Sequence, residues 1–183
     1  MERSLQIYCV VHTQKEKNMP EKFTVKDREE LKQLIKAMID RDGPNCDLNF
    51  IDVSQVTDMS ELFIDAPLNE FNGDISQWDV SNVTNMRFMF CFNCNFNGDI
   101  SKWNVSNVKN MESMFLHAHH FNRDLSQWDV SNVTNMDGMF DHCHLTPPAW
   151  YSNRANPSNN NVSEQENTDD SIGDYIELND IVL

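Results

Sequence analysis

The stretch that decides the fold is FNGDISQWDVSNVTNMRFMFCFNCN, residues 71–95, because the chain repeats it twice more without a gap. The two copies occupy residues 96–120 and 121–145, and 13 of the 25 columns hold the same residue in all three. These columns read F-N-x-D-x-S-x-W-x-V-S-N-V-x-N-M-x-x-M-F from the first residue of each copy. Identity at a fixed period is typical of repeat proteins, in which each copy folds as one unit and packs on its neighbours.

A degenerate fourth copy precedes these three. Residues 51–63 match residues 78–90 position for position, and the connection to the next copy is two residues longer and contains Pro67. Stacked units need about three or more copies before they bury a continuous core. The chain therefore holds enough copies, about four, to form such a stack.

Apolar spacing inside one copy predicts the shape of the unit. Ile75, Trp78 and Val80 follow an L-x-x-L-x-L spacing, which marks a short strand, and Ser81-Asn82 form a turn. The following apolar residues step by three, three and one, which indicates a short helical segment that begins near Thr84. We therefore expect an α/β repeat solenoid that is leucine-rich-repeat-like, with short parallel strands on one face and short helical turns on the other.

The motif of residues 71–86, with its copies, resembles the 25-residue repeats of the BspA-like surface proteins, a leucine-rich-repeat-related family first known from mycoplasma lipoproteins. The resemblance covers residues 20 to 151. It implies a binding or adhesion scaffold, often displayed on a cell surface, with a role in surface or host interaction.

The ends of the chain differ from the repeat, as the ends of a solenoid must. Residues 20–45 are expected to form an N-terminal capping helix, with Thr24 as its N-cap, Asp27 as its fourth residue and Gly43-Pro44 as its end. Its apolar stripe consists of Leu31, Leu34, Ile35, Met38 and Ile39. We expect the solenoid and its C-terminal cap to occupy residues 46–151, with Trp150 covering the last coil. Residues 1–19 are unassigned, and residues 152–183 have the acidic, polar composition of a disordered tail.

Residues that recur at the period are predicted to be structural. The tryptophans and methionines should fill the core, and the asparagines should form hydrogen-bonded ladders. The recurring aspartates are expected to cap turns, since the glycine–aspartate spacing of a calcium track is missing. These columns are Trp78, Trp103 and Trp128; Met86, Met111 and Met136; Met89, Met114 and Met139; Asn72, Asn97 and Asn122; Asn85, Asn110 and Asn135; Asp74, Asp99 and Asp124.

Residues that project outward from the strand face are the candidates for recognition. Their neighbours hold the scaffold, whereas these positions face solvent and include those that vary between the copies. The predicted partner-binding residues are Gln77, Asp79, Lys102, Asn104, Gln127 and Asp129. The chain shows no nucleophile in a characteristic setting and no phosphate-binding loop, so the leading interpretation is a non-catalytic protein-binding module without a cofactor.

Loop cysteines and histidines offer an alternative of a different class. Cys94, His119 and His144 fall in one column of the aligned copies, and zinc accepts such ligands. A metal-binding protein therefore stays open as a second hypothesis. The five cysteines are odd in number and scattered, which favours reduced thiols.

Charge narrows the choice of partner. The formal net charge is −15, of which residues 46–145 contribute −10 (4 basic and 14 acidic residues) and residues 146–183 contribute −6 (1 and 7). Such a surface repels nucleic acid and favours a protein partner with a basic surface, or an acidic decoy that mimics nucleic acid. We expect a monomer without a membrane span. The N-terminal residues do not resemble a signal peptide, which predicts a cytoplasmic location, whereas the family resemblance implies a secreted or surface one.

Overall fold

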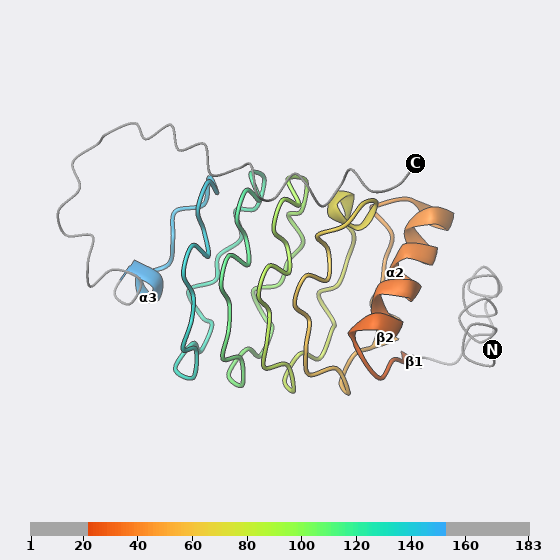
Figure 1. Ribbon diagram of the computed structural model, residues 1–183, viewed down its shortest axis with the longest axis horizontal. Helices are drawn as coiled ribbons and strands as arrows, with labels where there is room; N and C mark the ends of the chain where they lie inside the picture. Colours follow the sequence, from red (N-terminus) through yellow and green to blue (C-terminus); the bar gives the residue numbers. More distant parts are fainter. Residues whose placement is uncertain (1–21, 153–183) are drawn as a thin grey trace.

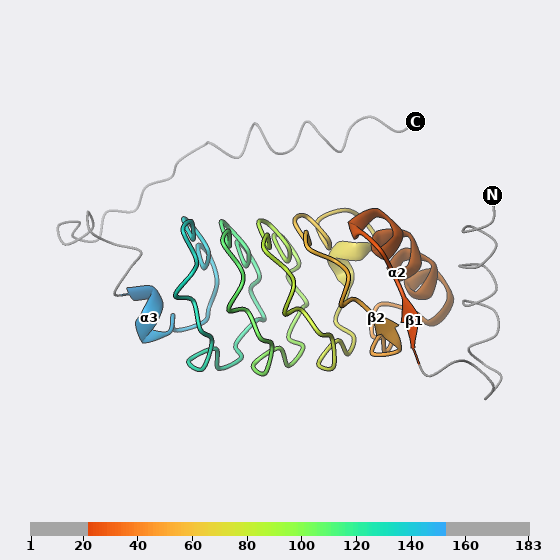
Figure 2. The ribbon, with the colours of Figure 1, turned by 90° about the horizontal axis from the view of Figure 1, so that it is seen from below.

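The computed structural model describes residues 22–152, which form a row of coils closed by a helix at each end (Figure 1). Helix α2 (Arg28–Asp42) covers one end of the row, and the short helix α3 (Ala149–Ser152) lies beyond the last coil at the other end. Seen after a 90° turn, the coils lie side by side in the order of the sequence (Figure 2). Residues 1–19 and the expected tail after Ser152 lie outside the described residues.

Helix α2 begins later than the sequence suggests. Its N-cap is Asp27, whose side chain accepts a hydrogen bond from the backbone N–H of Glu30. The prediction that Thr24 caps this helix is therefore wrong. At the other end Gly43 adopts a φ of 85°, a left-handed value that favours glycine, and its N–H donates to the carbonyl of Ile39.

The apolar stripe of α2 is buried as predicted: Leu31, Leu34, Ile35, Met38 and Ile39 all belong to the core. The helix thus closes the apolar end of the stack. No helix among residues 22–152 is long and apolar enough to cross a membrane.

Two short parallel strands attach the residues before α2 to the first coil. Strand β1 (Phe23–Thr24) pairs with β2 (Ile51–Asp52), with Phe23 opposite Ile51. The Thr24 hydroxyl donates to the Asp52 carboxylate at 2.9 Å. This long-range pairing takes Thr24 away from the helix and leaves the capping role to Asp27.

Backbone hydrogen bonds join successive coils along one limb of the repeat. Parallel bridges link Asp58 to Asn85, Asn85 to Asn110 and Asn110 to Asn135. The N–H of Met86 donates to Asn110 O at 2.8 Å, and further such bonds follow at every second residue as far as Phe92. Each coil therefore supplies acceptors for the coil before it.

The segment that pairs between coils is not the one that the sequence suggests. Strands were expected at 75–80, yet this segment consists of turns, and the strands assigned within residues 22–152 are β1 and β2. The Trp78 N–H donates to Ile75 O at 3.1 Å and the Val83 N–H to Val80 O at 2.9 Å, so these donors are used inside one coil. The segment after Thr84, expected to be helical, instead combines β-turns, such as that closed by the Met89 N–H and Met86 O, with the bonds between coils.

Aromatic columns fill the core. Each indole of the tryptophan column is 4% exposed, which confirms its predicted place, and its N–H donates to a carbonyl of the preceding coil at 2.9 to 3.2 Å. Two phenylalanine columns interleave beside it, with ring centroids 4.0 Å apart between Phe90 and Phe96 and 4.2 Å apart between Phe115 and Phe121. Both methionine columns are buried as well, as predicted.

The C-terminal cap reproduces these contacts without repeating the sequence. Trp150 stands 22 residues after Trp128 rather than 25, yet its indole N–H donates to Leu125 O at 2.9 Å, the bond that a further coil would make. The Tyr151 ring meets Phe140 edge-on with centroids 5.0 Å apart. Burial raises the pKa of the Tyr151 hydroxyl, although hydrogen bonds with the backbone of Met139 and Phe140 oppose that rise. Trp150 therefore covers the last coil as expected.

The asparagine columns act in two ways. Asn72 and Asn97 each accept, through the side-chain oxygen, the backbone N–H of the asparagine in the next coil, at 2.9 and 3.3 Å, so this predicted ladder is confirmed. In the other column Asn85, Asn110 and Asn135 bond to their own coil through the N–H two residues on. Their backbones, not their side-chain oxygens, link the coils.

Candidate functional site

All six residues predicted to bind a partner are exposed, and they lie on turns rather than on strands. We call this set the turn face: Gln77, Asp79, Lys102, Asn104, Gln127 and Asp129. Two turns per coil build it, each started by an Asp or Asn whose side-chain oxygen accepts the N–H of a serine two residues later. The first turn pairs Asp74 with Ser76, and the second pairs Asp79 with Ser81.

Half of the turn face therefore has a structural duty as well. Asp79, Asn104 and Asp129 each hold a serine N–H at 3.0 to 3.2 Å. Gln77, Lys102 and Gln127 lie in the first turn, next to its serine. Within residues 22–152 the side-chain hydrogen bonds of Gln77 and Gln127 go to that serine and are long, 3.4 and 3.3 Å. These three are the more adaptable part of the surface.

Hydrogen bonds keep the turn aspartates ionised. Bonds from the hydroxyl and N–H of Ser81 hold the pKa of Asp79 below its ordinary value, and Ser101 acts in the same way on Asp99. The pKa of Asp74 is lowered chiefly by the Ser76 N–H, and that of Asp124 chiefly by the Ser126 N–H. The predicted turn-capping role of this aspartate column is confirmed, and the columns present a regular array of negative charge.

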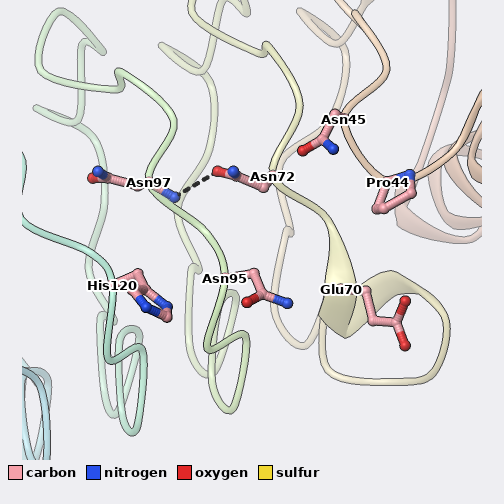
Figure 3. A pocket seen from close by; sticks show the side chains of 7 residues that line it. All are labelled: Pro44, Asn45, Glu70, Asn72, Asn95, Asn97 and His120. Carbon is pink, nitrogen blue, oxygen red and sulfur yellow. Dashed lines mark hydrogen bonds between the residues drawn. The ribbon is translucent and has the colours of Figure 1, made fainter.

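A polar groove runs past the first of these turns, whose Asp74 and Ser76 line part of it. Seven residues that line another part of the groove are drawn in Figure 3. Two rows of side chains form its walls, each with one residue per coil: Asn45, Asn72 and Asn97 in one row, and Glu70, Asn95 and His120 in the other. This hollow encloses about 430 Å³, and a second hollow of about 500 Å³ shares the first row and reaches Asp74, Asp99 and Arg123. We call the whole feature the amide groove.

The asparagines of this groove have a free side-chain donor. The oxygens of Asn72 and Asn97 accept N–H groups of the next coil, whereas their amide nitrogens have no acceptor within residues 22–152. On the opposite wall the Nδ1 of His120 lies 2.7 Å from Cys94 O. Because a carbonyl only accepts, Nδ1 carries the hydrogen and Nε2 is left for other contacts.

The loop histidines stack rather than converge on a metal. His117 and His142 lie face to face with centroids 4.4 Å apart, and Phe92 covers the other face of His117 at 4.9 Å. Burial and the neighbouring imidazoles of His142 and His119 hold the pKa of His117 below its ordinary value.

The candidate ligands Cys94, His119 and His144 do not form a metal site in the described part of the chain. The Cys94 thiol donates to His117 O at 3.4 Å, and the rings of His119 and His144 are 5.7 Å apart and tilted. No group of three or more His, Cys, Asp or Glu among residues 22–152 is placed to hold a metal ion.

The cysteines are free thiols where the structure describes them: Cys46, Cys91, Cys94 and Cys143. Burial raises the pKa of Cys46 to about 11 and that of Cys91 to about 12, so both stay protonated at neutral pH. Neither thiol is activated as a nucleophile.

Sequence reasoning missed the amide groove. The row of Glu70, Asn95 and His120 falls on the last column of the repeat, one of the columns in which every copy has a different residue, and this variation was the available signal. The depth between the two rows depends on how the chain passes from one coil to the next, which no single copy reveals.

Comparison with known proteins gives one result. Residues 29–149 match the family model described as "Mycoplasma protein of unknown function, DUF285". Neither the curated proteins nor the solved structures give a match.

Proposed function

Since the chain belongs to the DUF285 family of mycoplasma proteins of unknown function, we propose that it is a non-catalytic module that binds a protein partner through the turn face. The observation that carries the proposal is the contrast between the buried core columns and the exposed turn positions. The core columns are nearly invariant from coil to coil, whereas the exposed turn positions between them change from Gln and Asp to Lys and Asn and back. Variation on a fixed scaffold is how repeat proteins form binding surfaces.

Charge favours a partner with a basic surface. The turn aspartates, including Asp74, Asp79 and Asp99, are negatively charged at neutral pH, and hydrogen bonds from serine groups lower their pKa further. Lys102 is the exception in the middle of the face, and its charge also lowers the pKa of Asp99. A complementary partner is basic, so the neighbouring aspartates attract it and Lys102 opposes its binding.

We further propose that the row of coils is a leucine-rich-repeat-related solenoid of the BspA-like kind. The 25-residue period, the capping helix α2 and the hydrogen bonds between successive coils support this relationship. The same relationship supports an adhesion or host-interaction role at a cell surface.

The turn face is tested with substitutions that leave in place the turn hydrogen bonds accepted by Asp79, Asn104 and Asp129. Gln77→Lys with Gln127→Lys adds positive charge between the turns, and Lys102→Glu removes it. Asp40→Lys, at an exposed position on α2, is the matched control. Each variant is immobilised. The proteins that it retains from an extract of the source cells, and separately from the medium around those cells, are compared by quantitative mass spectrometry.

We expect one basic protein to be retained by the wild type and by the Asp40→Lys control. It should be lost from the Gln77→Lys/Gln127→Lys variant and enriched on Lys102→Glu. The same retained set on all four proteins contradicts the proposal. If the retained protein binds nucleic acid and free DNA displaces it from every variant equally, the module is an acidic decoy instead.

A further inference from the structure

The amide groove is continuous across several coils. Its two hollows share Asn45, Asn72 and Asn97, which belong to three successive coils, so the groove follows the long direction of the row. A third hollow beyond it is lined by Asn122, Arg123 and His144, among others. Such a shape suits a linear chain better than a compact small molecule.

The groove offers unused hydrogen-bond donors at the spacing of the coils. Because the Asn72 and Asn97 oxygens each accept a backbone N–H group, each side chain is fixed in orientation; its oxygen keeps one lone pair, and its two amide hydrogens are the donors left for a ligand. A ligand for this row must therefore carry acceptors at intervals along its length. The backbone carbonyls of an extended peptide meet that requirement.

The charged residues of the walls are mostly acidic. Glu70, Asp74 and Asp99 contribute carboxylates, and hydrogen bonds from serine groups lower the pKa of Asp74 and Asp99. Arg123 is the basic residue of the lining, and its Nε donates to Asn97 O at 2.8 Å, so part of its hydrogen-bonding capacity is already used. Cationic side chains of a ligand would therefore pair with Glu70, at the end of the amide groove nearest to α2.

Carbohydrate fits these walls poorly. The phenylalanines next to the groove, Phe71 and Phe96, are fully buried, and the imidazole of His120 is the one aromatic ring that lines the two hollows. The broad face of a Phe, Tyr or Trp ring, on which a sugar would stack, is missing from this described lining.

We propose that the amide groove binds an extended cationic segment of the protein partner, with its carbonyls on the asparagine row and a Lys or Arg at Glu70. This inference rests on the proposed function and adds the form in which the partner is recognised. The variable row of Glu70, Asn95 and His120 then selects the sequence of the segment.

The test uses a fluorescent ten-residue peptide of alternating lysine and serine, with a glutamate–serine peptide for comparison. Anisotropy at low salt measures binding to the full chain. Asn97→Asp is the informative variant: it keeps the oxygen that accepts the Asn122 N–H, loses the amide hydrogens and adds a negative charge. Glu70→Gln removes charge at the groove, and Asp40→Asn removes the same charge from α2.

We expect Asn97→Asp to weaken the lysine peptide about fivefold, the loss of one hydrogen bond, although its added charge alone would strengthen binding. Glu70→Gln should weaken the lysine peptide as well, and Asp40→Asn should leave it unchanged. Tighter binding to Asn97→Asp overturns the inference.

Two further outcomes separate this inference from the proposed function. If Gln77→Lys/Gln127→Lys abolishes peptide binding while Asn97→Asp strengthens it, cations bind the turn face and only the groove proposal fails. If the wild type binds the lysine and glutamate peptides equally, both proposals fail. Binding of a neutral hexose oligomer in place of the lysine peptide would also overturn the groove proposal.

Discussion

His117 is an ionisable residue within a column of stacked rings. Its imidazole lies between Phe92 and His142, and all three residues adopt left-handed backbone angles, with φ of 54 to 58°. Left-handed angles are uncommon for bulky residues, so the three side chains share one geometry that the coil imposes. The column itself shows that phenylalanine is accepted where histidine stands in the next coil.

His117 should make the protein less stable in mild acid. Burial lowers its pKa in the folded state relative to the ordinary value near 6.5, with Asp141 acting in the opposite direction. The unfolded chain therefore binds more protons below that pH, so the stabilisation is complete above about pH 6.5 and falls as the pH drops towards the folded-state pKa.

The His117→Phe variant isolates this contribution, because the column already holds Phe92 in the same conformation. Urea unfolding at pH 7.5 and pH 5.5 measures the difference in the free energy of unfolding. We expect a smaller difference in the variant than in the wild type, since the variant lacks both the partly buried imidazole and its repulsion with the charged forms of His142 and His119. An unchanged difference would show that His117 plays no part in the acid response.

Single residues were the easiest features to predict. The exposure of Gln77 and Lys102 and the burial of Trp78 follow from their places in the repeat, because the same environment recurs in every copy. The structural duty of Asp79 was less visible, although a serine follows it two residues later. Exposure and occupied hydrogen bonds are separate properties, and the repeat pattern predicts the first better than the second.

Elements at the ends of the stack were harder to predict, because non-local contacts decide them. Thr24 and Asp27 both have capping side chains, and the pairing of Thr24 with Asp52 settles the choice. The strands expected at 75–80 are absent for a local reason, because the Trp78 and Val83 N–H groups bond within their own coil. The L-x-x-L-x-L spacing specifies which side chains point inward, but leaves open which N–H groups bond within the coil.

Helix α3 stabilises the last coil mainly through Trp150. Trp150→Ala removes a half-buried ring and the bond to Leu125 O, and should lower the free energy of unfolding by about 2 to 3 kcal/mol. Trp150→Phe keeps a ring against Phe140 and loses the hydrogen bond, for a cost of about 1 kcal/mol. Denaturant titration compares the two, and equal losses would show that α3 does not act through this indole.

At the scale of the whole molecule, the period makes one coil removable. Deleting residues 96–120 brings Asn135 to the place of Asn110, so that Met86 and Phe90 again find acceptors in the next coil. The shortened chain should fold, with lower stability and a urea m-value lower by about a fifth, in proportion to the surface buried. The loss of the partly exposed Arg87–Glu112 ion pair should matter little.

A deletion of residues 103–126 is the matched control for this experiment, because its extra residue falls inside a coil, whereas the connection before Phe71 already accommodates two extra residues. It removes one residue fewer and places every later side chain one position out of phase with its column. Circular dichroism and urea unfolding should show a cooperative fold for the first deletion and its loss for the second. If both variants fold equally well, the contacts between coils do not depend on the period.

The Trp150 cap has a consequence for how such a gene changes. Because α3 makes the contacts of a further coil without the repeat sequence, the cap accepts whichever copy precedes it. Misaligned recombination between neighbouring copies inserts or removes a whole coil in frame and leaves both ends intact. The length of the binding surface can therefore evolve by steps of one repeat, while the ends that keep the protein folded are inherited unchanged.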